Sequence, residues 1–96
     1  MNIVWDEIKR IKNIAKHKMD FADLDPEFFA EATLSPSVED RSLAVGIFKG
    51  RVVVAVVFRP LGNEAISVIS MRPASRKERN AYDQAQPRAS VAPRGD

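Results

Sequence analysis

The spacing of apolar residues changes at Arg41, and this change limits the chain to a fold that combines helices with a sheet. Before Arg41, apolar residues such as Ile8 and Ile11 recur every three to four positions, which is typical of an amphipathic helix. After it they alternate, and residues 52–58 are continuously apolar. A run of this length is typical of a strand covered on both faces. The sequence therefore predicts an α+β domain.

Two helices and a loop are predicted before this change of period. A helix over 7–18 is expected to begin after Asp6, because an aspartate at this position accepts hydrogen bonds from free backbone N–H groups. A second, short helix over 26–32 begins at Pro26, since proline is tolerated in the first turn of a helix. The polar residues 35–40 are interpreted as a loop.

Four strands are predicted: a brief edge strand over 3–5, and three strands over 41–48, 52–59 and 64–72. Short turns join the last three, which indicates an antiparallel meander with the middle strand at the centre of the sheet. The first helix is expected to pack on that strand through an apolar stripe that includes Ile8 and Ile11. Strict alternation in the last strand places Met71 on the face opposite Ile66 and Val68.

A third helix is predicted over 75–85. Ser75 and Glu78 have the spacing of a capping box, in which each side chain satisfies a backbone donor at the start of a helix. We expect residues 1–85 to form one domain. Residues 86–96 contain proline, arginine, serine, alanine and glycine and almost nothing apolar, so we expect a flexible tail there.

The composition excludes several classes of site. The chain has no cysteine and one histidine, which excludes disulfide scaffolds, thiol catalysis and metal sites built from several histidines. No metal ion or other cofactor is therefore expected. The first residues lack the order of a signal peptide, and no apolar run approaches the roughly 20 residues that span a bilayer. We expect a cytoplasmic protein that does not interact with membranes.

The net charge of +2 conceals a strong segregation of charge along the chain. Residues 20–40 contain seven acidic residues and neither lysine nor arginine, so the rest of the chain is strongly basic. A dense basic surface favours partners that carry phosphates. The acidic segment has two interpretations: a solvated surface, or a surface that binds a basic partner or neutralises the basic surface of the chain itself.

The densest group of potential functional residues lies where the last predicted strand ends and the last helix begins. Arg72 ends the strand, and the helix carries Arg76, Lys77, Arg79 and Tyr82. Guanidinium groups beside the free N–H groups of a helix start form a good phosphate-binding surface. The structural alternatives are a solvated helix face with Tyr82 in the core, and an ion pair between Arg72 and an acid such as Glu78.

A second group lies on the first helix. His17 carries the imidazole of the chain, and imidazole is suited to proton transfer near neutral pH. Lys9, Lys12 and Lys16 form a row that could follow a phosphate backbone. Both have a structural alternative. In it His17 simply contacts a carbonyl or water at the end of the helix, and the lysines form a charged outer helix face.

Two blocks of sequence carry a more specific pattern. The first consists of Val4-Trp5-Asp6-Glu7, Asn13, Lys16-His17 and Phe21, and the second runs over 66–79 and includes Ile69-Ser70-Met71-Arg72, with Tyr82 after it. In their order and separation these blocks resemble the BrnT family of bacterial toxins, and the resemblance covers nearly the whole chain except the tail. Lys18 departs from it, since many members have glycine there, and the segment 33–42 is less similar.

The resemblance implies a RelE-like fold, in which N-terminal helices pack on a twisted antiparallel sheet and a C-terminal helix follows. It implies a ribonuclease that inhibits translation and growth, with RNA as its substrate. The implied partner is a BrnA-like antitoxin with a ribbon-helix-helix DNA-binding part, which neutralises the toxin. Promoter DNA would be contacted only through this antitoxin.

A metal-independent endoribonuclease needs groups that stabilise charge on the phosphate and groups that transfer protons. The residues expected to serve in catalysis are Arg72, Arg76, Arg79, His17 and Tyr82, and a lysine such as Lys16 is an alternative for proton transfer. The residues expected to bind RNA are Lys9, Lys12, Lys16, Arg59 and Lys77. We expect an acidic or helical segment of the antitoxin to cover the arginines. A non-catalytic module that binds nucleic acid or ribosomes, and a protein-interaction domain, are the alternative functions.

Overall fold

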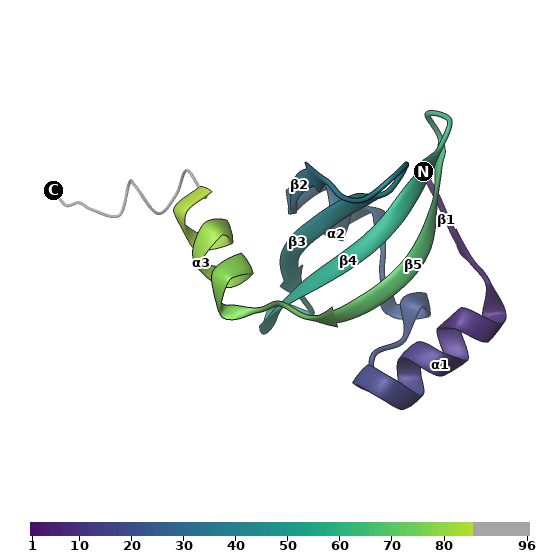
Figure 1. Ribbon diagram of the computed structural model, residues 1–96, viewed down its shortest axis with the longest axis horizontal. Helices are drawn as coiled ribbons and strands as arrows, with labels where there is room; N and C mark the ends of the chain where they lie inside the picture. The colour runs from purple at the N-terminus through teal and green to yellow at the C-terminus, as the bar shows by residue number, and fades with distance from the viewer. Residues whose placement is uncertain (86–96) are drawn as a thin grey trace, which may run out of the picture.

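The computed structural model describes residues 1–85. In chain order its elements are β1 (Asn2–Trp5), α1 (Glu7–His17), the 3-10 turn η1 (Phe21–Asp23), α2 (Pro26–Glu31), β2 (Thr33–Pro36), β3 (Ser42–Phe48), β4 (Val52–Leu61), β5 (Ala65–Pro73) and α3 (Arg76–Ala85). Figure 1 shows a curved sheet with α2 behind it, α1 next to β5, and α3 following the end of β5. The predicted tail, residues 86–96, lies outside the described residues.

The five strands form one sheet in the order β1-β5-β4-β3-β2. The apolar strand β4 therefore lies at the centre, as predicted, and β3, β4 and β5 form the predicted antiparallel meander. At one edge β1 pairs in parallel with β5. These elements confirm the α+β class, with helices before the sheet and one helix after it.

Strand β2 was not predicted from the sequence; it pairs antiparallel with β3 at the other edge of the sheet. Part of β2 falls in the stretch that was interpreted as a loop. Its register places Thr33 opposite Val45 and Pro36 opposite Ser42. The strand lacks an apolar alternation, and Leu34 is 59% exposed, so pairing with β3 rather than burial defines this strand.

A β-bulge in β5 corrects the predicted faces of that strand. Phe58 pairs with Val68, but the residue before Phe58 pairs with Ser70, so Ile69 is an extra residue. One extra residue reverses the alternation of side chains. Met71 is therefore buried in the same core as Val68, whereas the sequence placed it on the opposite face.

The main core lies between the sheet and the segment that contains η1 and α2. Its largest fully buried side chains are Phe21, Met71, Val54, Val56 and Val68. On β3 the residue that faces α2 is Gly46, and a Cβ atom there would lie 3.1 Å from the Cβ of Ala32. Glycine therefore allows α2 to lie close against β3.

The predicted packing of α1 is wrong. The helix contacts β5 rather than the central strand. Its apolar stripe faces outward, since Ile8 is 66% exposed and Ile11 is 56% exposed. The buried residue of the helix is instead Asn13. The 3.6-residue period identified the helix, but polar side chains with specific hydrogen-bond partners take the inward position here.

On the opposite face of the sheet α3 closes a smaller core, which consists of Val45, Ala55, Ala74 and Tyr82. The Tyr82 side chain is 5% exposed, so the structural alternative for this residue, a place in the core, is confirmed. No helix in residues 1–85 has the length and apolar character that a membrane span requires.

Candidate functional site

Basic side chains of α1 line a cavity of about 200 Å³ beside β5. The lining residues are Lys9, Lys12, Asn13, Lys16, His17, Ile69 and Ser70. The three lysines follow one another at spacings of three and four, so they form one row along the helix. The structure therefore brings the whole predicted group on α1 into one cavity, with His17 at its end.

A second cavity of about 200 Å³ adjoins the first, because Lys9 and Ile69 line both. Its other lining residues are Asp6, Arg41, Arg59, Ser67 and Val68. We call the two cavities together the basic groove; its cationic side chains are Lys9, Lys12, Lys16, Arg41 and Arg59. The ion pair of Arg59 with Asp40 is long, at 3.9 Å, and largely exposed, so it holds Arg59 only weakly.

Asn13 fixes α1 against β5. Its Oδ1 accepts a hydrogen bond from the N–H of Met71 at 3.0 Å, and its Nδ2 donates to the carbonyl of Met19 at 3.0 Å. The pairing of β5 with β1 ends at Val68, so this amide takes the place of a strand neighbour farther along β5. The lysine row therefore has a defined position over the strand.

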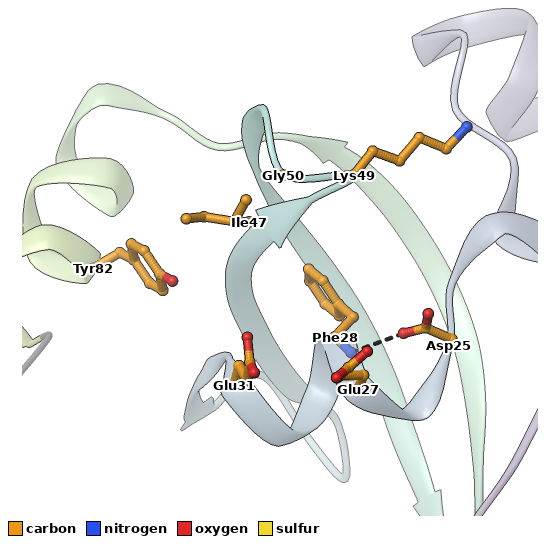
Figure 2. A pocket seen from close by; sticks show the side chains of 8 residues that line it. All are labelled: Asp25, Glu27, Phe28, Glu31, Ile47, Lys49, Gly50 and Tyr82. Carbon is orange, nitrogen blue, oxygen red and sulfur yellow. Dashed lines mark hydrogen bonds between the residues drawn. The ribbon is translucent and has the colours of Figure 1, made fainter.

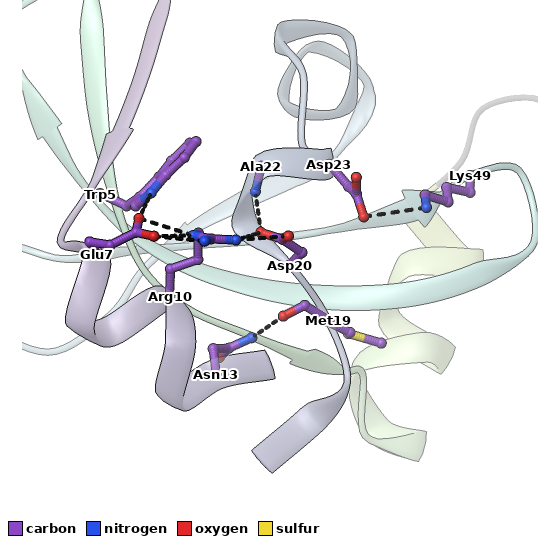
Figure 3. Close-up of polar contacts among 9 residues, drawn as sticks. All are labelled: Trp5, Glu7, Arg10, Asn13, Met19, Asp20, Ala22, Asp23 and Lys49. Atoms are coloured by element: carbon purple, nitrogen blue, oxygen red, sulfur yellow. Dashed lines mark hydrogen bonds and ion pairs between the residues drawn. The ribbon is translucent and has the colours of Figure 1, made fainter. Parts of the chain in front are cut away.

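Arg10 also fixes α1, through ion pairs with two carboxylates. Its Nη2 lies 2.6 Å from Oε2 of Glu7, and its Nη1 lies 2.9 Å from Oδ2 of Asp20 (Figure 3). Asp20 also accepts a hydrogen bond from the N–H of Ala22, and this bond together with Arg10 lowers the pKa of Asp20. Arg10 likewise lowers the pKa of Glu7. The network joins α1 to η1 and fixes the orientation of the helix.

Lys18, at which many members of the resembled family have glycine, is the left-handed residue that follows α1. Lys18 has φ 59°, and its N–H donates to the carbonyl of Ile14 at 2.8 Å. Glycine adopts this conformation without the steric cost that a side chain adds. Lysine thus occupies a turn for which glycine is the better suited residue.

Arg72 forms a two-point ion pair with Glu78, with Nη1–Oε1 and Nη2–Oε2 distances of 2.8 and 2.9 Å. Glu78 also accepts from the Ser75 N–H, and the Ser75 hydroxyl accepts from the Glu78 N–H, which confirms the predicted capping box. Hydrogen bonds from Arg72 above all lower the pKa of Glu78 to about 2, and Glu78 raises the pKa of Arg72. The ion pair between Arg72 and Glu78, which was the structural alternative for Arg72, is therefore present.

The remaining cationic residues predicted on α3 are not among the residues that line the basic groove. Arg76, Lys77 and Arg79 are exposed. Lys77 lines a different cavity, of about 550 Å³, together with residues of β2, β3 and α3. Lys77 of α3 and the lysines of α1 thus line separate cavities.

Tyr82 is also separated from the basic groove. Figure 2 shows its ring at the edge of a pocket of about 420 Å³, and the other lining residues are Asp25, Glu27, Phe28, Glu31, Ile47, Lys49 and Gly50. Three of these are carboxylates, which repel a phosphate. The pocket shares no lining residue with the basic groove.

Arg41 and Asn13 were not predicted as site residues from the sequence. Arg41 ends the turn before β3, where its N–H donates to Val38 and its carbonyl accepts from Ser37. Its position in the groove with Lys9 depends on the fold, so no local pattern indicates it. The available signal for Asn13 was its spacing of four from His17, which placed both on one side of the helix.

This arrangement has the groups that bind and act on a phosphate chain. Lysine and arginine side chains bind phosphates, and an imidazole transfers protons near neutral pH. Ser67 and Ser70 add hydroxyl groups to the floor of the groove. Across residues 1–85, no group of three or more histidine and acidic side chains is arranged to hold a metal ion.

Comparisons with known proteins support the same interpretation. A sequence model of a family described as the ribonuclease toxin BrnT of type II toxin-antitoxin systems matches residues 5–78. The 1.1 Å crystal structure of the Brucella abortus ribonuclease toxin BrnT is 56% identical and has a TM-score of 0.75, over 79% of this chain and 99% of that chain. Among curated proteins there is no significant match.

These matches confirm the predicted ribonuclease toxin over the two non-catalytic alternatives, and they imply a cognate antitoxin and an RNA substrate. The family match spans most of the chain, and a relative of this identity has the same fold. The chain therefore belongs to the BrnT family, the ribonuclease toxins of type II toxin-antitoxin systems.

Proposed function

We propose that this toxin binds RNA along the basic groove and cleaves it there without a metal ion. The observation that carries the proposal is the cavity in which His17 lies with Lys9, Lys12 and Lys16. The lysines neutralise the phosphates of the substrate, and the imidazole provides proton transfer at the same place. Cleavage of cytoplasmic RNA then inhibits translation and growth.

The cleavage step needs one base and one acid. The 2′-hydroxyl of the RNA attacks the adjacent phosphorus, a base removes its proton, and an acid donates a proton to the 5′-oxygen that leaves. His17 performs one of these transfers, and Lys16 in the same cavity is the candidate for the other. Tyr82 is less suited, because its pocket contains three carboxylates. The cations of the groove supply the positive charge that a metal ion would otherwise provide.

Arg72 is the candidate for stabilising the charge that develops on the phosphoryl oxygens. Ser70 lines the groove, and Arg72 lies two residues farther along β5, on the same face of the strand. Glu78 holds the two Nη groups, which fixes the guanidinium plane and leaves the Nε–H outside the ion pair. Arg76 and Arg79, exposed on α3, are further candidates for contacts with the substrate.

The cognate antitoxin is proposed to be BrnA-like, with a ribbon-helix-helix part that binds DNA. In this arrangement the toxin itself does not contact the promoter, and the antitoxin links the two. The family assignment supports this proposal, since a type II toxin is neutralised by a protein partner. Gel-shift measurements with promoter DNA should show binding by the complex and by the antitoxin, and none by the toxin alone.

Cleavage of a labelled RNA by purified toxin tests both parts of the proposal. Excess EDTA tests whether a metal ion is needed, and substitution of groove lysines tests where the RNA binds. Wild-type toxin should remain active in EDTA, and the double variant Lys12→Gln/Lys16→Gln should cleave at least tenfold more slowly at low RNA concentration. The matched control is Lys49→Gln/Arg51→Gln, which removes two cations from the turn between β3 and β4. Equal loss in both double variants would mean that overall charge, and not the groove, determines the rate.

A further inference from the structure

The apolar stripe of α1 lies outside the two hydrophobic cores and is exposed. Ile8, Ile11 and Ala15 follow one another at spacings of three and four, so they form one line along the helix. Ile8 is 66% exposed, Ile11 is 56% exposed, and Ala15 is exposed as well. A patch of this kind marks an interaction surface when charged residues border it.

The border of the stripe is the lysine row of the basic groove. Lys12 lies four residues from Ile8 and four from Lys16, so it stands between the stripe and the groove. Any molecule that covers the stripe therefore lies directly beside side chains that line the groove. A molecule bound to the stripe would therefore hinder the access of RNA to the groove. This inference rests on the function proposed above.

We propose that the stripe is the docking site of an amphipathic, acidic segment of the cognate antitoxin. Apolar side chains of this segment cover Ile8, Ile11 and Ala15, and its carboxylates pair with Lys12 and Lys16. Both lysines are thereby withdrawn from RNA. The antitoxin then neutralises the toxin by competing for the same cations, and the side chains of His17 and Arg72 keep their positions.

Charge decides between this occupant and a second copy of the chain. Two α1 helices that packed through their stripes would bring two lysine rows together, and like charges at such distances repel. Residues 1–19 carry a net charge of +3, so two copies of this helix would bring together an excess of positive charge. An acidic partner satisfies the apolar stripe and the lysine row at once.

The test measures binding of the full-length toxin to its antitoxin by calorimetry, beside RNA cleavage by the free toxin. Ile8→Ser/Ile11→Ser should weaken antitoxin binding at least tenfold and leave the cleavage rate of the free toxin unchanged. Ile11→Glu should weaken binding further, because it places a carboxylate against an acidic segment. The matched control is Leu34→Ser, which changes a side chain of similar exposure on β2 and should bind the antitoxin normally.

Three results would overturn the proposal. The first is wild-type antitoxin affinity in both isoleucine variants, whose folding is checked by circular dichroism. The second is loss of antitoxin binding in Arg76→Ala/Arg79→Ala while the isoleucine variants bind normally, which would place the antitoxin on α3. The third is a toxin dimer in sedimentation that Ile8→Ser/Ile11→Ser converts to a monomer. If the lysine variants instead cleave RNA normally, the groove assignment fails while the binding results still decide the docking site.

Discussion

Asn13 shows how a single residue positions the proposed site. Its side-chain amide satisfies one buried N–H of β5 and one half-buried carbonyl of the chain after α1. The sequence placed this residue on the polar side of an amphipathic helix, which is ordinarily the solvent side. The interior role depends on where the pairing of β1 with β5 ends, and that is a property of the assembled sheet.

Asn13→Ala should lower the free energy of unfolding by about 1–3 kcal/mol, because it leaves the N–H of Met71 and the carbonyl of Met19 without a partner. Urea denaturation measures this change. The control is Asn80→Ala, since Asn80 is an exposed residue in the interior of α3 and alanine favours a helix. Equal stability of the two variants would show that the Asn13 hydrogen bonds do not hold the helix.

Arg72 has a structural role in its ion pair with Glu78 and a proposed catalytic role, and mutation can separate the two. Arg72→Ala should slow RNA cleavage roughly 100- to 1000-fold if the guanidinium stabilises the transition state. Glu78→Gln weakens the same ion pair but keeps the guanidinium, so it should retain much more activity. Single-turnover cleavage rates give the comparison, with melting temperatures measured beside them. Equal losses of activity in the two variants would restrict Arg72 to its structural role.

At the scale of the elements, the sequence predicts those features of the fold that depend on residues close together in the chain. The capping box of α3, the position of β4 and the meander follow from patterns that lie within a few residues. The outward stripe of α1, the pairing of β2 and the bulge at Ile69 do not, because each depends on contacts between segments distant in the chain. The candidate site divides in the same way: its α1 residues are sequence neighbours, whereas Arg41 joins them only in the fold.

The ion pair that holds α3 to β5 should make stability depend on acid. The pKa of Glu78 falls from its ordinary value of 4.5 to about 2 in the folded chain. A carboxyl whose pKa is lower in the folded state contributes stability above pH 4.5 and loses it as the pH falls toward 2. Glu78→Gln should therefore flatten this part of the pH profile of urea denaturation, while Glu64→Gln, an exposed change, should leave it as in the wild type. A Glu78→Gln profile as steep as that of the wild type would contradict the role of the pair.

At the scale of the whole molecule, the basic groove and the pocket beside Tyr82 carry opposite charge. The cations of the basic groove lie on α1, on β4 and in the turn before β3, whereas carboxylates at and within α2 line the pocket beside Tyr82. The modest net charge of +2 therefore describes neither region. This separation allows a polyanion to bind one side of the molecule although acidic and basic residues are nearly equal in number.

The dependence of RNA affinity on salt measures how many groove cations contact phosphates. Each contact with a single strand contributes a slope of about −0.7 to a plot of log K against log salt concentration. Lys12→Gln/Lys16→Gln should make the slope shallower by about 1.4, which corresponds to two contacts. Lys49→Gln/Arg51→Gln should leave the slope unchanged. A slope that responds equally to both changes would mean that RNA has no defined path on the surface.

The cleavage rate of His17→Gln, measured beside that of Tyr82→Phe, tests the central claim most directly, because these two candidates lie in different pockets. Both substitutions keep the approximate size of the side chain, and RNA affinity and melting temperature serve as controls. If cleavage occurs in the basic groove with His17 in proton transfer, His17→Gln should be at least 100-fold slower and Tyr82→Phe nearly as fast as the wild type. A His17→Gln toxin that cleaves at the wild-type rate, with Tyr82→Phe inactive but folded, would contradict it.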